Sequence, residues 1–354
     1  MAQLQSSPRP SRTWPLLVTA LVAVVALLAP AYLQTGPLLA FAQPGDPTQV
    51  SPAAAEQGMV KVHTTVDYQG VVGYGAGIVL TPDGVVLTNN HVIAGADTID
   101  AVSVGSGQRY PAQLLGYDRT NDIAVIQLLG ANGLPTAPIG DSNQVAVGEP
   151  VVSLGNASGN SSISREEGQV SALGQNIVAE DDLTGSAEQL SGLIGVAAPV
   201  RPGDSGGPLV NSAGQVIGVT VAASVNYKVG PTGKGFAIPI NRAVAIANQI
   251  QSKTPSDTVH IGPPAMLGIG VATAQQRSKG VVVRDVIRGT PAEQAGLTRG
   301  DVITSLDGVA LDNATTLTAV LDRHYPGDVI DMTWVDATGQ QRIGKVQLAT
   351  GPHG

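Results

Sequence analysis

The stretch "RPGDSGGPLVN", residues 201–211, decides the fold, because glycine and proline surround Ser205 at its centre. Residues Gly203 to Gly207 match G-x-S-x-G, the turn in which a strand passes directly into a helix and exposes a serine. A lone match of this kind is weak evidence, since glycine-rich turns are common connectors. The next run, "PLVNSAGQVIGV" (208–219), predicts a hairpin with its turn at "NSAG" rather than a helix. The strand-to-helix interpretation therefore fails.

The alternative places the partners of Ser205 upstream in the chain. His91 lies in "LTNNHVIAGA" (87–96), where a strand ends and a short turn or helix begins. Asp122, in "DRTNDIAVIQL" (118–128), stands at the entry to a strand. The order His, Asp, Ser is one of the known orders of a catalytic triad. An imidazole can take the serine proton, and a carboxylate fixes the histidine tautomer.

Other residues compete for two of these roles. Asp118 is the main competitor for the acid, but as a surface turn residue it is expected to be solvated, whereas Asp122 precedes an apolar run and can be buried. Each of the remaining histidines has a structural explanation: His63 in a first strand, His260 in a linker, His324 after a helix and His353 in the tail.

Composition limits the class of protein. The 354 residues are enough for at least two domains, and 44 glycines with only 13% charged residues indicate many short strands and turns. The net charge of −8, without a basic stripe, argues against a nucleic-acid partner. The absence of cysteine excludes disulfides, thiolate metal sites and cysteine nucleophiles. The acidic residues Glu166, Glu167, Asp181 and Asp182 lack a histidine or a ligand spacing, so we expect solvated charges, no metal and no cofactor.

The first 42 residues predict export. Arg9 and Arg12 precede the apolar run 15–29, and "AFA" (40–42) offers a cleavage site, as in a secretory signal peptide. Because the apolar region is long, an uncleaved membrane anchor is the alternative. The protein is therefore expected to be secreted or extracytoplasmic, and membrane-anchored if the leader stays.

The rest of the chain divides into segments of different composition and apolar spacing. Residues 43–58 indicate a flexible lead-in, and the short apolar runs of 59–253 indicate a sandwich or barrel that ends with a helix over 240–253. Residues 254–264 are a predicted linker, and 265–349 predict an independent α+β module. In that module Thr290 is expected to cap a short helix.

The blocks "LTNNHVI", "DIAV" and "GDSGGPLVN" resemble the three triad blocks of trypsin-like serine proteases of the HtrA type. The similarity extends to "GAGIVLTPDGVVLTNNHV" (75–92), "GQVSALG" (168–174) and "GVTVAAS" (218–224), and covers residues 60–349. The resemblance implies a mainly β fold: a chymotrypsin/trypsin-like double β-barrel followed by a small α+β PDZ domain.

The same resemblance implies a role for each matching residue. His91 is the general base, Asp122 the orienting acid and Ser205 the nucleophile, while the backbone N–H groups of Gly203 and Ser205 form the oxyanion hole. A primary specificity pocket would be walled by uncharged residues and so prefer small or medium aliphatic side chains: Val200, Thr220, Val221 and Ala222. The stretch "AMLGIGV" (265–271) resembles the carboxylate-binding loop of PDZ domains, which implies that C-terminal peptides bind at Met266, Leu267, Gly268 and Ile269, beside a helix near 314–323.

Two departures from the family pattern stand out. Many HtrA-type enzymes carry Asn where this chain has Asp204; we expect Asp204 to accept local hydrogen bonds, the alternative being a cation such as a mature N-terminus. Family members commonly trimerise through aromatic residues before the first strand, and 43–59 contains none, so a homo-oligomer is possible but the trimer is in doubt.

The intact triad favours an exported serine endopeptidase that hydrolyses unfolded or secreted proteins. The alternative is a PDZ-based peptide-binding or chaperone protein with a latent protease domain.

Overall fold

The structure is a computed structural model that describes residues 51–66, 71–157, 159, 162–181, 186–221, 227–229, 235–271 and 280–353. The predicted leader, 1–42, lies outside the described residues. Within the described part of the chain, no helix is long and apolar enough to cross a membrane.

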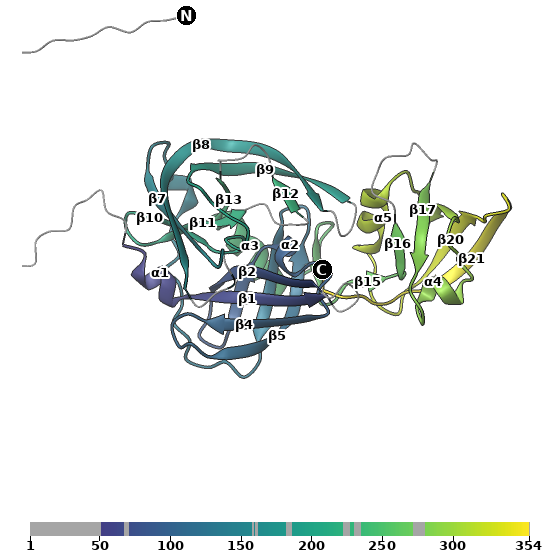
Figure 1. Ribbon diagram of the computed structural model, residues 1–354, viewed down its shortest axis with the longest axis horizontal. Coiled ribbons are helices and arrows are strands. Elements are labelled where there is room, and N and C mark those ends of the chain that lie inside the picture. The colour runs from purple at the N-terminus through teal and green to yellow at the C-terminus, as the bar shows by residue number, and fades with distance from the viewer. Residues whose placement is uncertain are drawn as a thin grey trace, which may run out of the picture. The chain divides into compact units, whose positions relative to one another are not determined.

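The first β-barrel is built from six antiparallel strands in the order β5-β4-β1-β2-β3-β6, and pairing of β5 with β6 closes it (Figure 1). The strands are β1 (Met59–Val66), β2 (Val71–Val79), β3 (Val85–Thr88), β4 (Thr98–Ser103), β5 (Arg109–Asp118) and β6 (Ile123–Leu128). Aliphatic side chains such as Val62, Ile99 and Ile126 fill its interior. Closure leaves no sheet edge within the ring.

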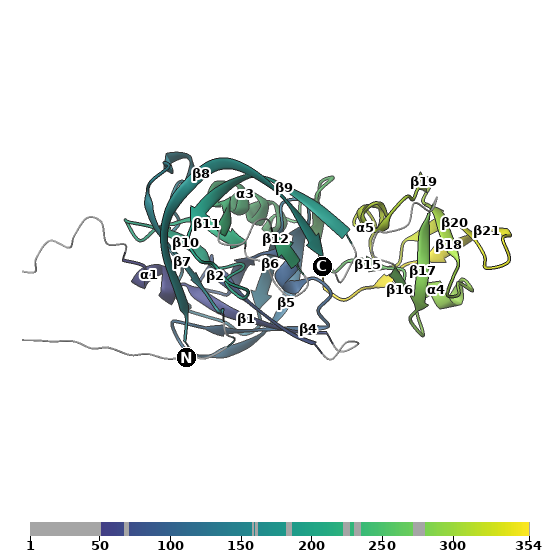
Figure 2. The same cartoon turned by 45° about the horizontal axis from the view of Figure 1, so that its top comes forward.

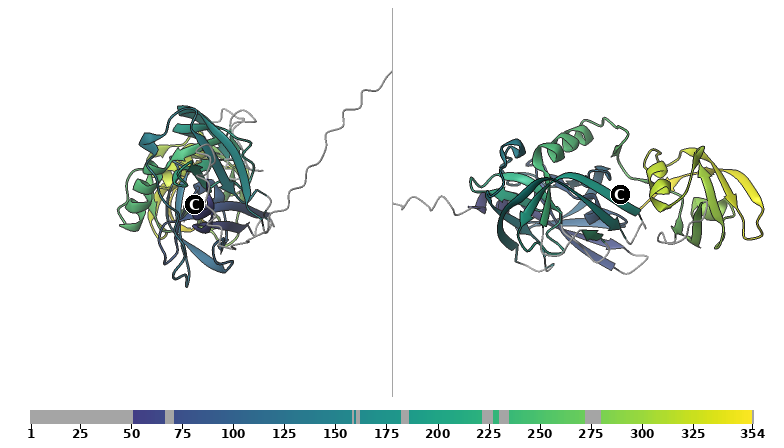
Figure 3. Two further views of the ribbon diagram at one scale, coloured as in Figure 1. Left: turned by 90° about the vertical axis from the view of Figure 1, so that its left-hand side faces the viewer. Right: turned by 90° about the horizontal axis from the view of Figure 1, so that it is seen from above.

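The second β-barrel has the strand order β8-β7-β10-β11-β13-β9, closed by pairing of β8 with β9. Its strands are β7 (Pro150–Gly155), β8 (Ser164–Asp181), β9 (Ser186–Ala197), β10 (Pro208–Asn211), β11 (Val216–Val221) and β13 (Gly235–Pro239), and β12 (Tyr227–Val229) pairs with β8 outside the ring. The long strands β8 and β9 can be followed in Figures 2 and 3. The hairpin of β10 and β11 is the one predicted from "NSAG", so the strand-to-helix alternative is excluded.

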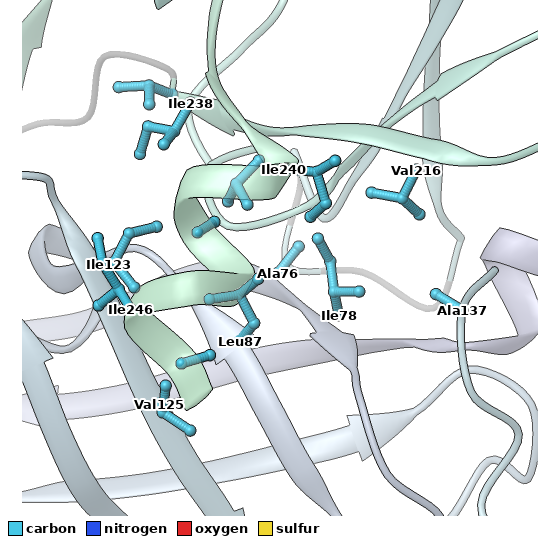
Figure 4. Close-up of a cluster of buried hydrophobic side chains, with 14 of the residues drawn as sticks. Ala76, Ile78, Leu87, Ile123, Val125, Ala137, Val216, Ile238, Ile240 and Ile246 are labelled. Atoms are coloured by element: carbon cyan, nitrogen blue, oxygen red, sulfur yellow. The ribbon is translucent and has the colours of Figure 1, made fainter. Parts of the chain in front are cut away.

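Helix α3 (Ile240–Gln251) closes the protease region and matches the predicted helix over 240–253. Apolar residues recur at three- and four-residue spacing, which places them on one face of the helix. Figure 4 shows Ile240 and Ile246 of α3 among Ile78 and Leu87 of the first barrel and Val216 of the second. Each such aliphatic side chain contributes about 1.5–3 kcal/mol when fully buried. The shared core fixes the two barrels together without aromatic residues at these positions.

The C-terminal module is α+β, as predicted. Its main sheet has the order β16-β17-β18-β20-β21, and β19 pairs with β18. The elements are β15 (Ala265–Met266), β16 (Ile269–Val271), β17 (Val281–Val286), α4 (Pro291–Gln294), β18 (Val302–Leu306), β19 (Val309–Ala310), α5 (Ala314–Leu321), β20 (Val329–Val335), β21 (Gln341–Gln347) and β22 (Ala349–Thr350). The module has its own cluster of buried side chains, including Leu306, Leu317 and Trp334.

Three local features differ from the sequence expectation. The predicted flexible lead-in contains a short helix, α1 (Ala53–Gln57), because Ala55 is buried in the core and Glu56 pairs with Arg165. The predicted linker contains β14 (Val259–Ile261), which pairs with β5. Thr290 occupies the N-cap position of α4, but its hydroxyl donates to the carbonyls of Ile287 and Gly268 instead of capping the helix.

Candidate active site

The pairing of β3 with β6 brings the proposed base and acid together. Helix α2 (Asn90–Ile93) begins two residues after β3, and Asp122 directly precedes β6; Thr88 of β3 pairs with Ala124 of β6. His91 Nδ1 therefore lies 2.8 Å from Asp122 Oδ2 and 3.0 Å from Oδ1. The side chain of His91 is 5% exposed and that of Asp122 is 0% exposed. A buried carboxylate at this distance fixes which imidazole nitrogen carries the proton.

The turn between β9 and β10 carries Ser205, which is 3% exposed. Gly203 (φ +93°) and Gly206 (φ +81°) adopt the left-handed conformation that favours glycine. A Cβ on Gly203 would overlap the Asn156 carbonyl, and the Asn156 N–H donates to the Gly203 carbonyl at 3.0 Å. The requirement for glycine at position 203 thus has a local cause in close backbone packing.

Backbone hydrogen bonds hold this turn against the first barrel. The Ser205 carbonyl accepts from the Ala76 N–H of β2 at 2.8 Å. The Gly206 N–H donates to Asn89 Oδ1 at 2.6 Å, and Asn89 lies two residues before His91. The structure therefore brings His91, Asp122 and the Ser205 turn to one place where the two barrels meet.

Asp118 does not compete for the histidine, but the expectation that it is solvated was wrong. It is 1% exposed, because β14 covers this end of β5. Its carboxylate accepts from Asn121 N at 2.9 Å, Asn121 Nδ2 at 2.8 Å and Thr258 Oγ1 at 3.0 Å. Burial raises the pKa of Asp118 in spite of these donors. Asp118 thus organises its own turn, while Asp122 faces His91.

The other histidines have partners of their own. His63 lies 3.5 Å from Asp100 on neighbouring strands, His260 stacks between Tyr117 and Tyr325, His324 contacts Asp307 and Asp328, and the backbone of His353 pairs with Ala96.

Asp204, the departure from the family pattern, accepts local hydrogen bonds. It is fully buried, and its carboxylate accepts from Ser164 Oγ and from the Arg201 N–H at 2.8 Å. Burial raises the pKa of Asp204, and the donors from Ser164 and Arg201 oppose this shift. Glu166 pairs with Arg201 at 2.7 Å and is only 7% exposed, so the expectation of a solvated charge was wrong for Glu166. Glu167 is exposed, as expected.

No group of three or more potential metal ligands occurs among the residues that the structure describes. The side chains of Asp181 and Asp182 lie outside the described ones.

The residues expected to wall a specificity pocket lie on or beside β11. Thr220 is 1% exposed and its hydroxyl lies 2.9 Å from Ser153 Oγ, while Val221 is fully buried in the main core. Val200 is half-buried, and Ala222 lies outside the described residues. The three described residues are uncharged.

The expected carboxylate-binding loop joins β15 to β16. Met266 is half-buried, Leu267 is 1% exposed and Ile269 begins β16. Gly268 has φ +86°, and a Cβ there would overlap Thr290. The carbonyls of Leu267 and Gly268 accept from Ala292 N at 2.9 Å and Ile287 N at 3.0 Å. The loop is therefore fixed from the side of α4.

The two barrels, the buried His–Asp pair and the glycine-rich serine turn define a trypsin-like serine endopeptidase. A family model described as a trypsin-like peptidase domain matches residues 75–219, and a PDZ domain model matches 265–335. The serine protease PepD of Mycobacterium tuberculosis is 32% identical over 340 residues, covering 90% of this chain and 71% of that protein. The Do-like serine protease HtrA of Lactococcus lactis subsp. lactis is 33% identical over 285 residues, covering 75% of this chain and 67% of that protein. The chain belongs to the HtrA-type serine proteases.

A solved structure titled as the HtrA-type protease AlgW with tripeptide aligns with a TM-score of 0.49 and 28% identity, covering 86% of this chain and 98% of that chain. The chain spans about two thirds of the length of the relatives that it matches.

One buried residue next to the site received no role from the sequence. Asn89 was part of the "LTNN" context, but one asparagine before a histidine carries no signal of its function. Its contacts become visible only when β3, β6 and the serine turn are placed together.

Proposed function

We propose that this protein hydrolyses peptide bonds of unfolded or secreted polypeptides, with Ser205 as nucleophile, His91 as general base and Asp122 as the acid that orients His91. The observation that carries the proposal is the buried contact of 2.8 Å between His91 Nδ1 and Asp122 Oδ2, beside the glycine-rich turn of Ser205. A buried pair of this kind holds Nε2 as the proton acceptor, which is the state that a general base requires.

The chemistry follows from these positions. Ser205 Oγ attacks the scissile carbonyl carbon while His91 Nε2 takes the hydroxyl proton, and Asp122 stabilises the imidazolium that forms. The N–H groups of Gly203 and Ser205 donate to the developing oxyanion. The tetrahedral intermediate then expels the amine, which leaves with the proton from His91. Water, deprotonated by His91, hydrolyses the acyl-enzyme and frees Ser205.

Hydrolysis of unfolded casein by the purified protein tests this proposal, with Ser205→Ala as the matched control. We expect cleavage by the wild type and none above background by the variant. If the wild type leaves casein intact yet binds it, the alternative of a latent protease that acts as a binding protein is favoured. If the variant cleaves equally well, Ser205 is not the nucleophile.

The uncharged residues Val200, Thr220 and Val221 support a preference for small or medium aliphatic side chains before the scissile bond. A lysine or arginine in such a pocket would lack a counter-ion. Peptides with Val or Ala at this position should be cut faster than the matched peptide with Arg; faster cleavage after Arg contradicts the assignment.

The PDZ domain is proposed to bind C-terminal peptides along β16, beside α5. β16 is at one end of the strand order, and an extended peptide can add to such an edge through main-chain hydrogen bonds. The glycine loop before β16 would supply N–H groups to the terminal carboxylate.

Contacts at the end of α5 support regulation of the protease by such a peptide. Asp322 accepts from Tyr117 Oη at 2.7 Å and from Arg119 Nε at 2.9 Å. Arg119 is three residues before Asp122, so a shift of α5 can reach the turn that carries the acid. Titration of a hydrophobic C-terminal peptide should change the rate of casein hydrolysis, and should change it less in Asp322→Asn. An unchanged wild-type rate at saturating peptide contradicts this regulation.

The leader supports activity outside the cytoplasm. If it is cleaved after Ala42, the mature protein begins at Gln43; if it is retained, the protein stays with the membrane fraction. N-terminal sequencing of the protein from each fraction distinguishes the two.

The molar mass of the protein in solution tests whether it forms a trimer.

A further inference from the structure

Asn89 occupies the N-cap position of α2, but its side chain makes no hydrogen bond to the helix that it begins. An asparagine at this position ordinarily accepts from a backbone N–H of the first turn. Instead, Asn89 Nδ2 donates to the Asp122 carbonyl at 2.9 Å, and Asn89 Oδ1 accepts from the Gly206 N–H at 2.6 Å. The residue is fully buried. Its amide therefore joins the backbone beside the acid to the backbone beside the nucleophile.

Asp122 caps helix α2 in place of Asn89. Asp122 Oδ1 accepts from the backbone N–H of His91 at 3.0 Å, in the first turn of α2. One carboxylate thus orients the imidazole of His91 and caps its helix. The side chain of Asp122 therefore caps α2, and the side chain of Asn89 is bonded to the backbone carbonyl of Asp122.

Asp122 needs to be held, because its backbone is in an unfavourable conformation. Its φ of +52° lies in the left-handed region, which residues with a Cβ rarely adopt. Such a conformation persists only where the surroundings fix it. The hydrogen bond from Asn89 to the Asp122 carbonyl supplies one of these constraints directly on the strained residue.

Asn89 also fixes the peptide that follows the nucleophile. The carbonyl of Ser205 accepts from the Ala76 N–H at 2.8 Å, and the next N–H, of Gly206, donates to Asn89 and to the Thr220 carbonyl at 3.0 Å. Each polar group of the Ser205–Gly206 peptide is therefore bonded to a residue of the first barrel, and the Gly206 N–H is also bonded to Thr220 of the second barrel. Ser205 itself is carried by the second barrel.

We infer that Asn89 is a positioning residue that sets the placement of the acid relative to the nucleophile across the two barrels. This inference rests on the proposed triad. Asn89 does not contact the reacting atoms in this arrangement; it acts through Asp122 and through the turn of Ser205. A small displacement of reacting groups can lower a rate about 100-fold, so its loss should affect kcat much more than KM.

The first experiment compares Asn89→Ala with a variant that is only destabilised. We expect Asn89→Ala to lower kcat for a peptide substrate about 10- to 100-fold with KM changed less than about twofold. Ile99→Ala, in the core of the first barrel, alters none of the hydrogen bonds described above, so it should lower the melting temperature at least as much and leave kcat unchanged. Equal kcat in Asn89→Ala and Ile99→Ala overturns the inference.

A double-mutant cycle tests whether Asn89 acts through the acid. In an Asp122→Asn background, Asn89→Ala should cost less than about threefold in kcat, because the placement of the acid no longer matters. Independent, multiplicative losses contradict the positioning role.

Asn89→Asp serves where the alanine variant does not fold. Its carboxylate still accepts from Gly206 but cannot donate to Asp122 when ionised, so kcat should again fall. A wild-type kcat in this variant overturns the inference. An inactive wild type, or an active Ser205→Ala, would instead refute the proposed function.

Discussion

Two turns, one in each barrel, carry the proposed site, and they handle backbone strain differently. The turn between β5 and β6 places Asp122 at φ +52°, whereas the turn between β9 and β10 places Gly203 and Gly206 at φ +93° and +81°. Each turn also buries a carboxyl group beside its strained position, Asp118 in the first turn and Asp204 in the second. The strained position is therefore an aspartate in one turn and glycines in the other.

The difference follows from what each position must supply. At Gly206 a Cβ would overlap the Ala76 carbonyl, so the backbone itself has to approach the neighbouring strand and no side chain fits. At Asp122 the side chain is required, because it contacts His91. The strain there is offset by hydrogen bonds from Asn89 and His91. Asp122 keeps its side chain in a left-handed conformation because neighbouring residues stabilise it by hydrogen bonds. Gly206 has no side chain because the neighbouring strand leaves no space for one.

The largest effect on activity is expected when Asp122, in the first turn, is replaced. Asp122→Asn is expected to lower kcat about 10⁴-fold with the fold retained, because an amide favours the wrong imidazole tautomer. Steady-state kinetics with a peptide substrate measure the change. A loss of less than about tenfold would mean that Asp122 does not orient His91.

Asp118→Asn is the matched control, four residues earlier in the same turn. It leaves the contact between Asp122 and His91 in place and disturbs the bonds that Asp118 makes with Asn121 and Thr258. We expect a change of stability and a kcat within about threefold of the wild type. If both variants lose activity equally, the turn acts as one unit and the distinction between its two carboxylates is wrong.

The glycines of the second turn should be intolerant of a side chain for steric reasons. Gly206→Ala combines a left-handed φ with an overlap against backbone, and should cost at least about 3 kcal/mol of the free energy of unfolding. Gly133→Ala has a similar φ of +69° but nothing within 4 Å of the added Cβ, so about 1–2 kcal/mol is expected. Denaturant unfolding measures both, and equal losses would show that strain alone decides.

The sequence predicts the elements that carry the two turns, but not the long-range contacts that stabilise them. Local pattern predicts the hairpin after Ser205 and the helix over 240–253, because apolar spacing and turn residues act within a few positions. Asp118 is buried where β14 pairs with β5, and Glu166 forms an ion pair with Arg201; both partners lie far away in the chain. Asn89 escapes prediction for the same reason, since its partners are 33 and 117 residues away.

Asp204 gives the second turn a pH dependence that a neutral variant should remove. Burial raises the pKa of Asp204 above its unfolded value of 3.8, so the folded state binds this proton more tightly. Its contribution to stability is complete below that value and is lost as the pH rises through the folded pKa. Asp204→Asn should therefore gain stability relative to the wild type between pH 4 and pH 7. Melting curves that keep a constant difference across this range contradict the assignment.

Glu166→Gln should change the free energy of unfolding less than the other substitutions, and it tests why the second turn depends on pH. Its partner Arg201 has a side chain that is 62% exposed, so breaking this ion pair should cost no more than about 1 kcal/mol at pH 7, and less in high salt. Burial is the main cause of the raised pKa of Asp204, and the charge of Glu166 adds to it. The variant should therefore also show a weaker dependence of stability on pH than the wild type. Melting curves of the variant and the wild type measure this difference, and an unchanged pH dependence would show that the charge of Glu166 does not contribute to the raised pKa of Asp204.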